Sequence, residues 1–219
     1  MSGGKIIAFS GLDGAGKSTQ IELLRRYFQN QGRETVYLWT RGGYTPGFES
    51  AKNLLRRVSG RRAIPESGHS PQRRQAFSRP GVRKLWLGLA ILDLMWIYGL
   101  WLRWLRWRGK VIICDRYLPD TQIDFRLNFP QEDVENWPLW KLLKWATPLP
   151  DAAFLLLVPV AESVRRSDIK GEPFRDTAET LAKRLSQYER FAQSGFWTVL
   201  DGQRPIPELA AAIREKIEA

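Results

Sequence analysis

The chain has 219 residues, of which 43% are hydrophobic and 26% charged, so wholesale disorder is excluded and one α/β domain spanning 1–219 is expected. The formal net charge of +11 indicates an anionic partner: a small phosphorylated substrate, a nucleic acid or an anionic membrane. The single cysteine, Cys114, excludes an internal disulfide. Because no signal-peptide pattern precedes the first apolar run, we expect a cytoplasmic protein.

Apolar runs alternate with amphipathic segments along the whole chain. Five short runs predict strands, at residues 5–10, 34–39, 111–114, 152–158 and 197–200. Helical spacing at 19–29 predicts a helix after the first strand, and a C-terminal helix is expected after the fifth. Buried strands that alternate with helices predict a parallel five-stranded sheet covered on both faces.

The loop after the first predicted strand has the spacing of a phosphate-binding motif. Gly11, Gly16, Lys17 and Ser18 fit G-x-x-x-x-G-K-[ST], with a strand before and a helix after. Such a loop directs backbone N–H groups at phosphate oxygens, while the lysine reaches the β- and γ-phosphates and the serine binds Mg²⁺. We therefore expect ATP and Mg²⁺ at Gly11, Gly14, Ala15, Gly16, Lys17, Ser18 and Thr19.

A second polar group follows the third predicted strand. Asp115 and Arg116 come directly after the run 111–114, where ligands of parallel sheets collect. An aspartate there can hold Mg²⁺ through water, and an arginine can bind a phosphate with two parallel hydrogen bonds. A surface ion pair is the alternative interpretation.

With these motifs the chain resembles the thymidylate kinase family over nearly its whole length. The resemblance rests on "FSGLDGAGKSTQ", "TRGGYTPG", "RGKVIICDRY", "PDAAFLLLVPVAESVRR" and "TVLDG". It implies a P-loop NTPase fold, with Asp13 close to the acceptor and with Arg41 and Arg116 on the acceptor's phosphate. It also implies a lid at about 162–178 that carries Arg166 and Lys170 over ATP, and an adenine-side loop at Asp201.

The lid is also expected from its own charges. "ESVRRSDIKGEPFR" places four cations around a Gly-Glu-Pro turn, as suits a segment that closes over phosphates. The alternative interpretation is that Arg165 and Arg166 simply stabilise the end of a helix through their favourable interaction with its dipole.

The acceptor half departs from the resembled family. Ala90, Leu94 and Trp96 stand where the family has base-reading Phe, Arg and Gln, and Asp93 alone is kept. In the loop after Tyr117, residues Asp120, Asp124 and Phe125 replace Ser, Tyr and Gln. Asp120 and Asp124 share a helical face if a helix starts at Pro119, although Asp120 can also simply support the helix start. The candidate acceptor-binding residues are Asp13, Arg41, Asp93, Arg116, Tyr117, Asp120 and Asp124, with Lys17, Asp13, Arg116 and Arg166 as candidate catalytic residues.

Three functions remain open on this reading. The first is transfer of the γ-phosphoryl group of ATP to a nucleoside monophosphate, dTMP or a relative. The second is a kinase for a sugar or glycan hydroxyl, including one on a lipid carrier, for which an aspartate would serve as base. The third is a nucleic-acid-binding NTPase that uses the basic segment 52–84, where ten Lys or Arg stand against one acid. That segment lacks interleaved aromatic residues, which disfavours nucleic acid, and a solvated loop is the plain alternative.

The apolar segment 85–102 is long enough to suggest a transmembrane helix. Asp93 near its middle opposes this, and a spanning helix would put Lys17 and Asp115 on opposite sides of the bilayer. We expect instead a helix buried in the chain or in a homodimer interface. Trp101, Trp104 and Trp107 interleave with Arg103, Arg106 and Arg108, which leaves peripheral membrane contact as a further alternative.

Overall fold

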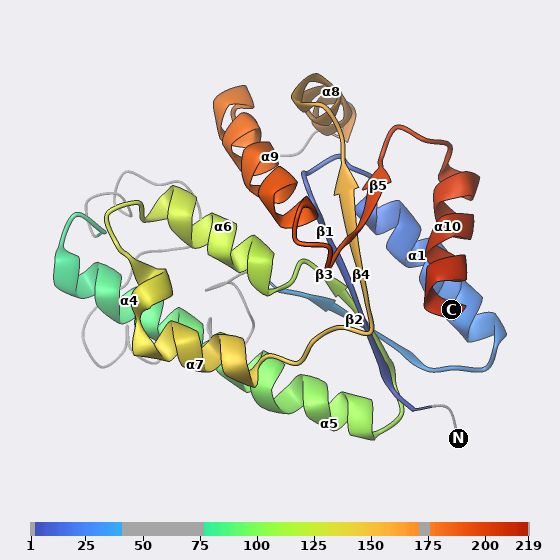
Figure 1. Cartoon of the computed structure of the whole chain (residues 1–219), viewed down its shortest axis with the longest axis horizontal. Helices are drawn as coiled ribbons and strands as arrows, with labels where there is room; N and C mark the ends of the chain where they lie inside the picture. The colour runs from blue at the N-terminus through green and yellow to red at the C-terminus, as the bar shows by residue number, and fades with distance from the viewer. Residues whose placement is uncertain (1–2, 41–76, 171–175, 219) are drawn as a thin grey trace. The chain divides into compact units, whose positions relative to one another are not determined.

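The computed structural model describes residues 3–40, 77–170 and 176–218, coloured by residue number in Figure 1. The strands are β1 (Lys5–Gly11), β2 (Thr35–Trp39), β3 (Val111–Asp115), β4 (Ala152–Leu157) and β5 (Thr198–Asp201). The helices are α1 (Lys17–Asn30), α4 (Pro80–Leu94), π-helical η1 (Met95–Trp101), α5 (Leu102–Trp107), α6 (Leu118–Asn128), 3₁₀ turn η2 (Val134–Asn136), α7 (Pro138–Ala146), α8 (Val160–Lys170), α9 (Ala178–Ala192) and α10 (Ile206–Glu218).

The chain forms two compact units, and the single domain expected from the sequence stays a prediction. The first comprises Met1–Trp39, Trp104–Glu132 and Leu149–Ala219, and the second comprises Thr40–Arg103 and Asp133–Pro148. The sheet and the phosphate-binding motif belong to the first unit. The basic segment lies outside the described residues up to residue 76, as does the Gly-Glu-Pro turn of the expected lid.

The first unit contains the predicted parallel sheet. Its five strands lie in the order β2-β3-β1-β4-β5, and every pair is parallel. Figure 1 shows α1 and α10 on one side of this sheet and α6 and α9 on the other. The central strand β1 is fully buried from Ile6 to Phe9, as a strand covered on both faces requires. The fold is therefore the α/β architecture of P-loop NTPases, as predicted.

The strand order brings the functional segments to one edge of the sheet. Phe9 of β1 pairs with Asp115 of β3 on one side and with Phe154 of β4 on the other. The loops that follow these strands therefore leave the sheet side by side. This edge is where open parallel sheets bind their ligands.

The second unit is built around α4, η1 and α7. Trp140 and Leu143 of α7 are buried there, as is Tyr98 of η1, whose hydroxyl is 2.5 Å from Oγ1 of Thr40. Pro138 and Pro80 lie in the first turns of α7 and α4, where the missing N–H costs nothing. Ala90 and Leu94 are also fully buried, so these two positions contribute to apolar packing.

The long apolar segment forms one helix, Pro80–Trp107, which is the only described helix that could cross a membrane by length and composition. Half of its most apolar stretch is buried inside the protein. The strands on either side of it along the chain also pair directly, with Thr35 of β2 opposite Val111 of β3. The burial of half of that stretch and the return of the chain to a neighbouring strand of the same sheet favour a helix packed within the protein over one that spans a membrane.

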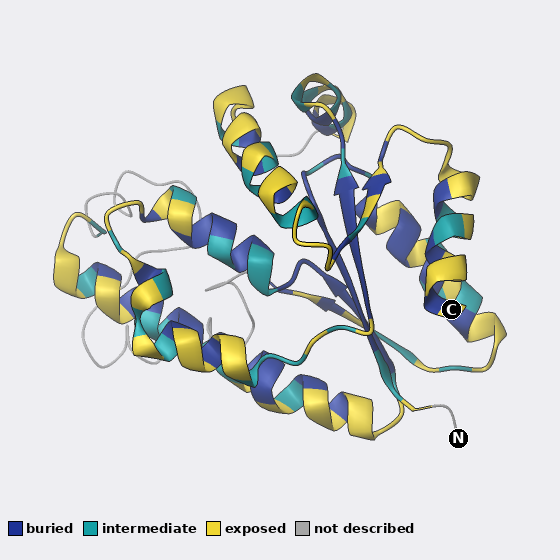
Figure 2. Cartoon of the chain, viewed as in Figure 1, coloured by how far each residue is buried: buried dark blue, intermediate teal, exposed yellow. Residues whose placement is uncertain are grey.

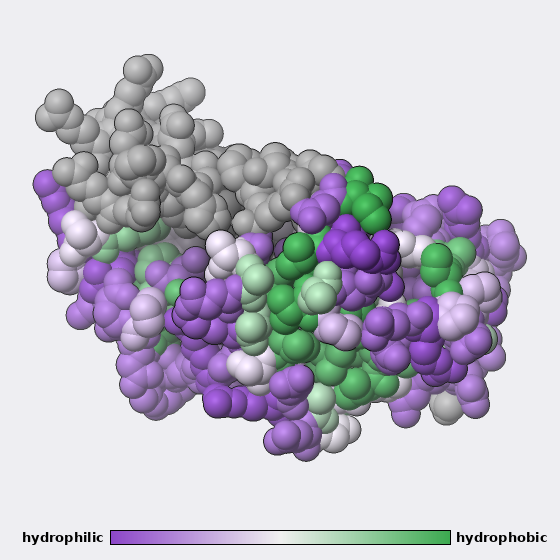
Figure 3. Space-filling model, turned by 90° about the horizontal axis from the view of Figure 1, so that it is seen from above, coloured by the Kyte–Doolittle hydropathy of each residue, from purple (hydrophilic) through white to green (hydrophobic). Residues whose placement is uncertain are grey.

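The molecular surface is mainly polar but not uniformly so. Figure 3 shows a face on which hydrophobic residues gather in a band bordered by hydrophilic ones. Figure 2 shows exposed and buried positions recurring along most of the helices, as expected for amphipathic helices that cover a core.

Candidate active site

The loop between β1 and α1 is shaped by three glycines. Gly11, Gly14 and Gly16 have φ values of 132°, 75° and 96°, a backbone conformation that other residues rarely adopt. A Cβ on Gly11 would also lie 2.1 Å from the carbonyl oxygen of Leu156 on β4. The loop can therefore lie against the neighbouring strand only because this residue has no side chain.

Lys17 begins α1 and folds its side chain back over this loop. Its Nζ donates hydrogen bonds to the carbonyl oxygens of Gly11 at 2.9 Å and Leu12 at 2.7 Å. The side chain is buried, and burial together with the nearby Arg116 guanidinium lowers the pKa of Lys17. An ammonium held in this way is positioned to exchange two carbonyl partners for phosphate oxygens.

The first turn of α1 is open toward solvent. Ser18 and Thr19 are exposed, and Gly16 at the helix start provides no side-chain cap for the first N–H groups. Unsatisfied N–H groups at a helix N-terminus favour an anion. The residues present therefore fit a nucleotide phosphate chain.

Asp115, the last residue of β3, has one carboxylate oxygen held and one open. Its Oδ2 accepts a hydrogen bond of 3.0 Å from the hydroxyl of Tyr37 on β2. Its Oδ1 is buried and has no hydrogen-bond partner among the described residues. A buried carboxylate oxygen of this kind needs a partner, and the water shell of a hydrated Mg²⁺ fits it.

The described residues contain no cluster of three or more His, Cys, Asp or Glu side chains that could hold a metal ion. A cation beside Asp115 would therefore take most of its ligands from phosphate oxygens and water. That ligand set is the usual one for Mg²⁺ in phosphoryl-transfer sites.

Arg116 has the only positive φ among the described non-glycine residues, at 76°. Its N–H donates to the carbonyl oxygen of Phe9 at 2.8 Å, which fixes this unusual turn at the end of β3. Backbone strain of this kind costs about 1 kcal/mol or more and is concentrated at functional sites. The turn aims the guanidinium back across the β1–α1 loop.

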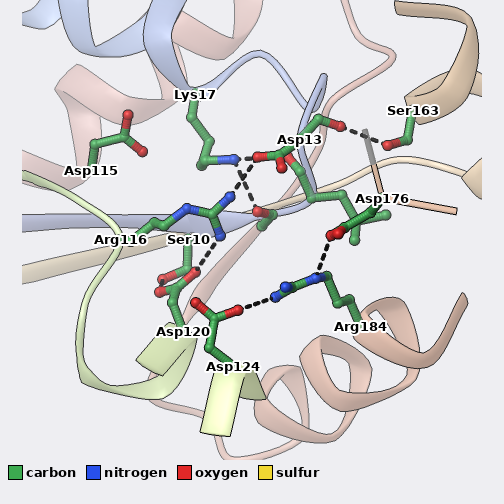
Figure 4. A network of polar contacts seen from close by, with 12 residues as sticks. Ser10, Asp13, Lys17, Asp115, Arg116, Asp120, Asp124, Ser163, Asp176 and Arg184 are labelled. Atoms are coloured by element: carbon green, nitrogen blue, oxygen red, sulfur yellow. Dashed lines mark hydrogen bonds and ion pairs between the residues drawn. The ribbon is translucent and has the colours of Figure 1, made fainter. Parts of the chain in front are cut away.

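The guanidinium of Arg116 is buried beside two carboxylates and a tyrosine hydroxyl. Nη2 lies 2.5 Å from Oδ1 of Asp13, and Nη1 lies 3.6 Å from Oδ1 of Asp120 and 3.5 Å from the hydroxyl of Tyr188. Burial opposes the charge, but Tyr188, Asp13 and Asp120 outweigh it and raise the pKa of Arg116. Arg116 therefore carries a fixed positive charge next to Lys17 (Figure 4).

Asp120 has both carboxylate oxygens occupied. Oδ2 accepts from Ser10 Oγ at 2.5 Å and from the N–H of Tyr117 at 2.9 Å, and Oδ1 accepts from the hydroxyl of Tyr188 at 2.7 Å. The contact with the Tyr117 N–H is the helix-supporting role considered above, because Tyr117 directly precedes α6. Its other bonds connect α6 to β1 and α9.

Asp124 lies one turn further along α6 and is paired with a buried arginine of α9. Arg184 Nη1 lies 2.6 Å from Oδ1 of Asp124, and its Nε donates to Oδ2 of Asp176 at 2.7 Å (Figure 4). Burial opposes the charge of Arg184, but Asp124 and Asp176 raise its pKa. The Arg184 guanidinium thus links Asp124 of α6 to Asp176, the first described residue after the gap in the expected lid.

The segment before that gap approaches the phosphate loop. Arg166 of α8 donates from Nη1 to the carbonyl oxygens of Gly14 at 3.2 Å and Gly202 at 3.0 Å, and from Nε to Glu162 at 2.5 Å. Ser163 donates to the carbonyl oxygen of Asp13 at 2.6 Å. The charge of Arg166 therefore lies at the edge of the phosphate loop, whereas Lys170 is exposed at the end of α8.

The loop after β5 also meets the phosphate loop. The N–H of Gly202 donates to Leu157 at 2.8 Å, and a Cβ on Gly202 would lie 2.6 Å from the carbonyl oxygen of Ala15. Asp201 beside it is exposed and accepts a hydrogen bond from the N–H of Gln203. The loop expected near adenine is therefore packed against the loop expected to bind phosphate.

The structure thus brings together most of the residues singled out from the sequence. Lys17, Asp13, Asp115, Arg116, Asp120 and Asp124 gather at one edge of the sheet. Asp93 is half-buried on α4 in the second unit, and Trp96 is 63% exposed there. Arg41 lies outside the described residues.

Sequence reasoning missed several polar residues of this network: Ser10, Tyr37, Ser163, Asp176, Arg184 and Tyr188. Arg184 and Tyr188 are one helical turn apart and share the buried face of α9 with Leu181. The sequence could have revealed these two residues, because both are polar and fall on the apolar face of an amphipathic helix.

The chain was compared with known proteins. No family model matches it. It is 28% identical to a thymidylate kinase of Plasmodium falciparum over 94% of this chain and 86% of that protein. It is 28% identical to a thymidylate kinase of Bifidobacterium longum over 98% of both chains, and 29% identical to one of Clavibacter michiganensis over 99% and 95%.

The chain is similar to thymidylate kinases over nearly its whole length. The similarity covers both units and both of the undescribed internal segments, so it concerns the whole architecture rather than the phosphate loop alone. The resemblance noted in the sequence is thereby confirmed, at an identity low enough to accommodate a divergent acceptor region.

Proposed function

We propose that this protein is an ATP-dependent kinase that phosphorylates a nucleoside monophosphate, dTMP or a close relative. The observation that carries the proposal is the convergence of Lys17, Arg116 and Arg166 on the β1–α1 loop of a chain similar to thymidylate kinases over nearly its full length. That overall similarity does not favour a glycan kinase or a nucleic-acid-dependent NTPase.

Each cation has a distinct task. Lys17 and the N–H groups of Gly14, Gly16 and Ser18 hold the β- and γ-phosphates of ATP, while Arg116 exchanges Asp13 for the acceptor's phosphate. Arg166 neutralises charge at the opposite edge of the loop. Such positioned cations stabilise the spread negative charge of phosphoryl transfer.

Ser18 and Asp115 are proposed to hold Mg²⁺, directly and through water respectively. Mg²⁺ would neutralise charge on the β- and γ-phosphate oxygens. Tyr37 orients Asp115 by holding Oδ2, which leaves Oδ1 free to face the ligand.

A monophosphate acceptor simplifies the chemistry. Its phosphate oxygen is ionised at neutral pH, so it forms the new bond to the γ-phosphorus without a general base, and ADP leaves as the β–γ bridge breaks. Asp120 and Asp124 are then not needed as bases, in keeping with the hydrogen bonds of Asp120 to Ser10 and Tyr188 and the ion pair of Asp124 with Arg184. A cytoplasmic location, suited to this substrate, is part of the proposal.

The test is a coupled ADP-release assay over a panel of nucleoside monophosphates that includes dTMP. We expect release with at least one member, and a drop of about 10²–10³ in kcat for Lys17→Met. Lys183→Met is the matched control, because Lys183 is an exposed lysine paired with Glu179 on α9. Absence of release with every monophosphate, together with release on a sugar or glycan acceptor, would contradict the proposal.

A further inference from the structure

Tyr188 of α9 is a buried polar residue that has no task in the proposed reaction. Its side chain is 1% exposed, and its hydroxyl donates a hydrogen bond of 2.7 Å to Oδ1 of Asp120. Burial and the Asp120 carboxylate raise the pKa of Tyr188, so the phenol keeps its proton at neutral pH. The hydroxyl therefore continues to occupy Oδ1 of Asp120 as a donor.

Arg116 lies next to this hydrogen bond without closing on the carboxylate. Its Nη1 is 3.6 Å from Oδ1 of Asp120 and 3.5 Å from the hydroxyl of Tyr188. Ion pairs between a guanidinium and a carboxylate normally close to about 2.7–2.9 Å. The other terminal nitrogen, Nη2, makes such a short contact, at 2.5 Å from Asp13 (Figure 4). The guanidinium is thus held toward the β1–α1 loop rather than against Asp120.

Asp120 would be a strong partner for Arg116 if Tyr188 did not occupy it. The carboxylate is 1% exposed, so water screens its charge very little. Its Oδ2 is anchored by the hydroxyl of Ser10 and the N–H of Tyr117, so the carboxylate cannot turn away. Without the Tyr188 hydroxyl, Oδ1 would be a buried acceptor beside a guanidinium, and the two groups would close on each other.

We propose that Tyr188 is a positioning residue for the acceptor's phosphate. Its hydroxyl prevents a direct ion pair between Arg116 and Asp120 and keeps the guanidinium available at the β1–α1 loop. The inference rests on the proposed function, in which Arg116 exchanges Asp13 for that phosphate. The Asp13 side chain is 41% exposed, so a phosphate can displace it, whereas the buried Asp120 would not be displaced.

The first test is steady-state kinetics of Tyr188→Phe, which removes the hydroxyl and keeps the ring. We expect the KM for the monophosphate to rise about ten-fold, because Asp120 then attracts the guanidinium. The KM for ATP should stay within about two-fold, since the groups that bind it are unchanged. Tyr27→Phe is the matched control, because it removes a hydroxyl bonded to another carboxylate, that of Glu218 on α10. It should have the kinetics of the parent.

The double variant Tyr188→Phe/Asp120→Asn separates positioning from structural support. Asparagine is uncharged and does not attract the guanidinium, so the double variant should recover most of the lost affinity for the monophosphate. A purely structural role of the hydroxyl predicts that the second substitution adds to the damage of the first. A KM that stays raised in a double variant shown to be folded by thermal melting would therefore overturn the proposal.

Crystal structures of the ligand-free parent and Tyr188→Phe test the positioning of Arg116 without any substrate. The separation between Nη1 of Arg116 and Oδ1 of Asp120 should fall from 3.6 Å to about 2.9 Å. An unchanged separation would overturn the proposal even if the kinase activity is confirmed. Absence of activity with every monophosphate would instead contradict the proposed function, and the separation would still decide whether Tyr188 positions Arg116.

Discussion

Single residues in this protein are tied to function mainly through buried charge. Arg184 is the clearest case, since it lies between Asp124 and Asp176 and connects α6 to the start of α9. A buried cation that satisfies two carboxylates is difficult to remove, because both acids are then left uncompensated.

We therefore expect Arg184→Met to lower the free energy of unfolding by about 3–5 kcal/mol. The measurement is urea denaturation at neutral pH. Lys183→Met, next to it on the exposed side of α9, should change stability by less than about 1 kcal/mol because its ion pair with Glu179 is solvated.

The double variant Arg184→Met/Asp124→Leu completes the experiment. Replacing both charged partners with apolar groups should recover a large part of the lost stability, because one buried carboxylate no longer lacks its cation. Equal stability of Arg184→Met and the parent would show that the pair does not hold α6 and α9 together.

Lys17 yields a prediction about proton uptake. Burial and Arg116 lower the pKa of its ammonium, whereas bound phosphates favour the charged form and raise it again. Nucleotide binding should therefore take up protons in the window between the lowered pKa and the raised one. Calorimetric heats of binding at about pH 9, below the ordinary lysine pKa, should then depend on the ionisation enthalpy of the buffer.

Repeating that titration with Lys183→Met should give the same buffer dependence, because its exposed ammonium is remote from the loop. Heats that are identical in all buffers would mean that the Lys17 pKa does not change on binding. The bound phosphates would then not stabilise the charged form of Lys17.

At the scale of elements, the loops around the phosphate site depend on close backbone approach. Gly202 follows β5 and has no room for a side chain, since a Cβ would lie 2.6 Å from the carbonyl oxygen of Ala15 and 2.7 Å from Val158. Gly88 on α4 is the opposite case, with nothing within 4 Å of an added Cβ.

Gly202→Ala should therefore weaken nucleotide binding and cost about 1–3 kcal/mol of stability, because the phosphate loop must move. Gly88→Ala should instead stabilise by about 0.5–1 kcal/mol, since alanine is the better helix former at an uncrowded site. Thermal melting and nucleotide titration of the two variants check both results. Tight binding by Gly202→Ala would contradict the close contact between the two loops.

The elements themselves were largely predictable from the sequence. Apolar runs located all five strands to within one or two residues. The inner strands β1, β3 and β4 are apolar nearly throughout because they are buried on both faces, whereas β2 and β5 are partly exposed. The start of α6 was also predictable, because Pro119 fits the first turn of a helix. The π-helical segment η1 was not, since nothing in the spacing of apolar residues within "MWIYGLW" distinguishes it from an α-helix.

The candidate site was predictable only where a motif has fixed spacing. The Gly11–Ser18 loop and Asp115–Arg116 were found because local sequence determines their geometry. Partners from distant segments, such as Ser10 with Asp120 or Arg184 with Asp124, depend on packing between helices and strands. The positive φ of Arg116 likewise follows from its hydrogen bond to Phe9 on the neighbouring strand.

For the whole molecule, the account rests on the capacity of the β1–α1 loop to bind a nucleoside triphosphate. Three observations are interpreted on the assumption that the loop binds nucleotide. They are the cations of the first unit, the unpaired Oδ1 of Asp115 and the similarity to thymidylate kinases. The identity of the acceptor is a further question that does not alter it.

Isothermal titration of the full-length protein with AMP-PNP and Mg²⁺ measures this capacity most directly. We expect a saturable heat with one site per chain, lost in Lys17→Met and retained in Lys183→Met. A parent protein that is folded yet releases no heat and shows no thermal stabilisation with AMP-PNP would contradict the account.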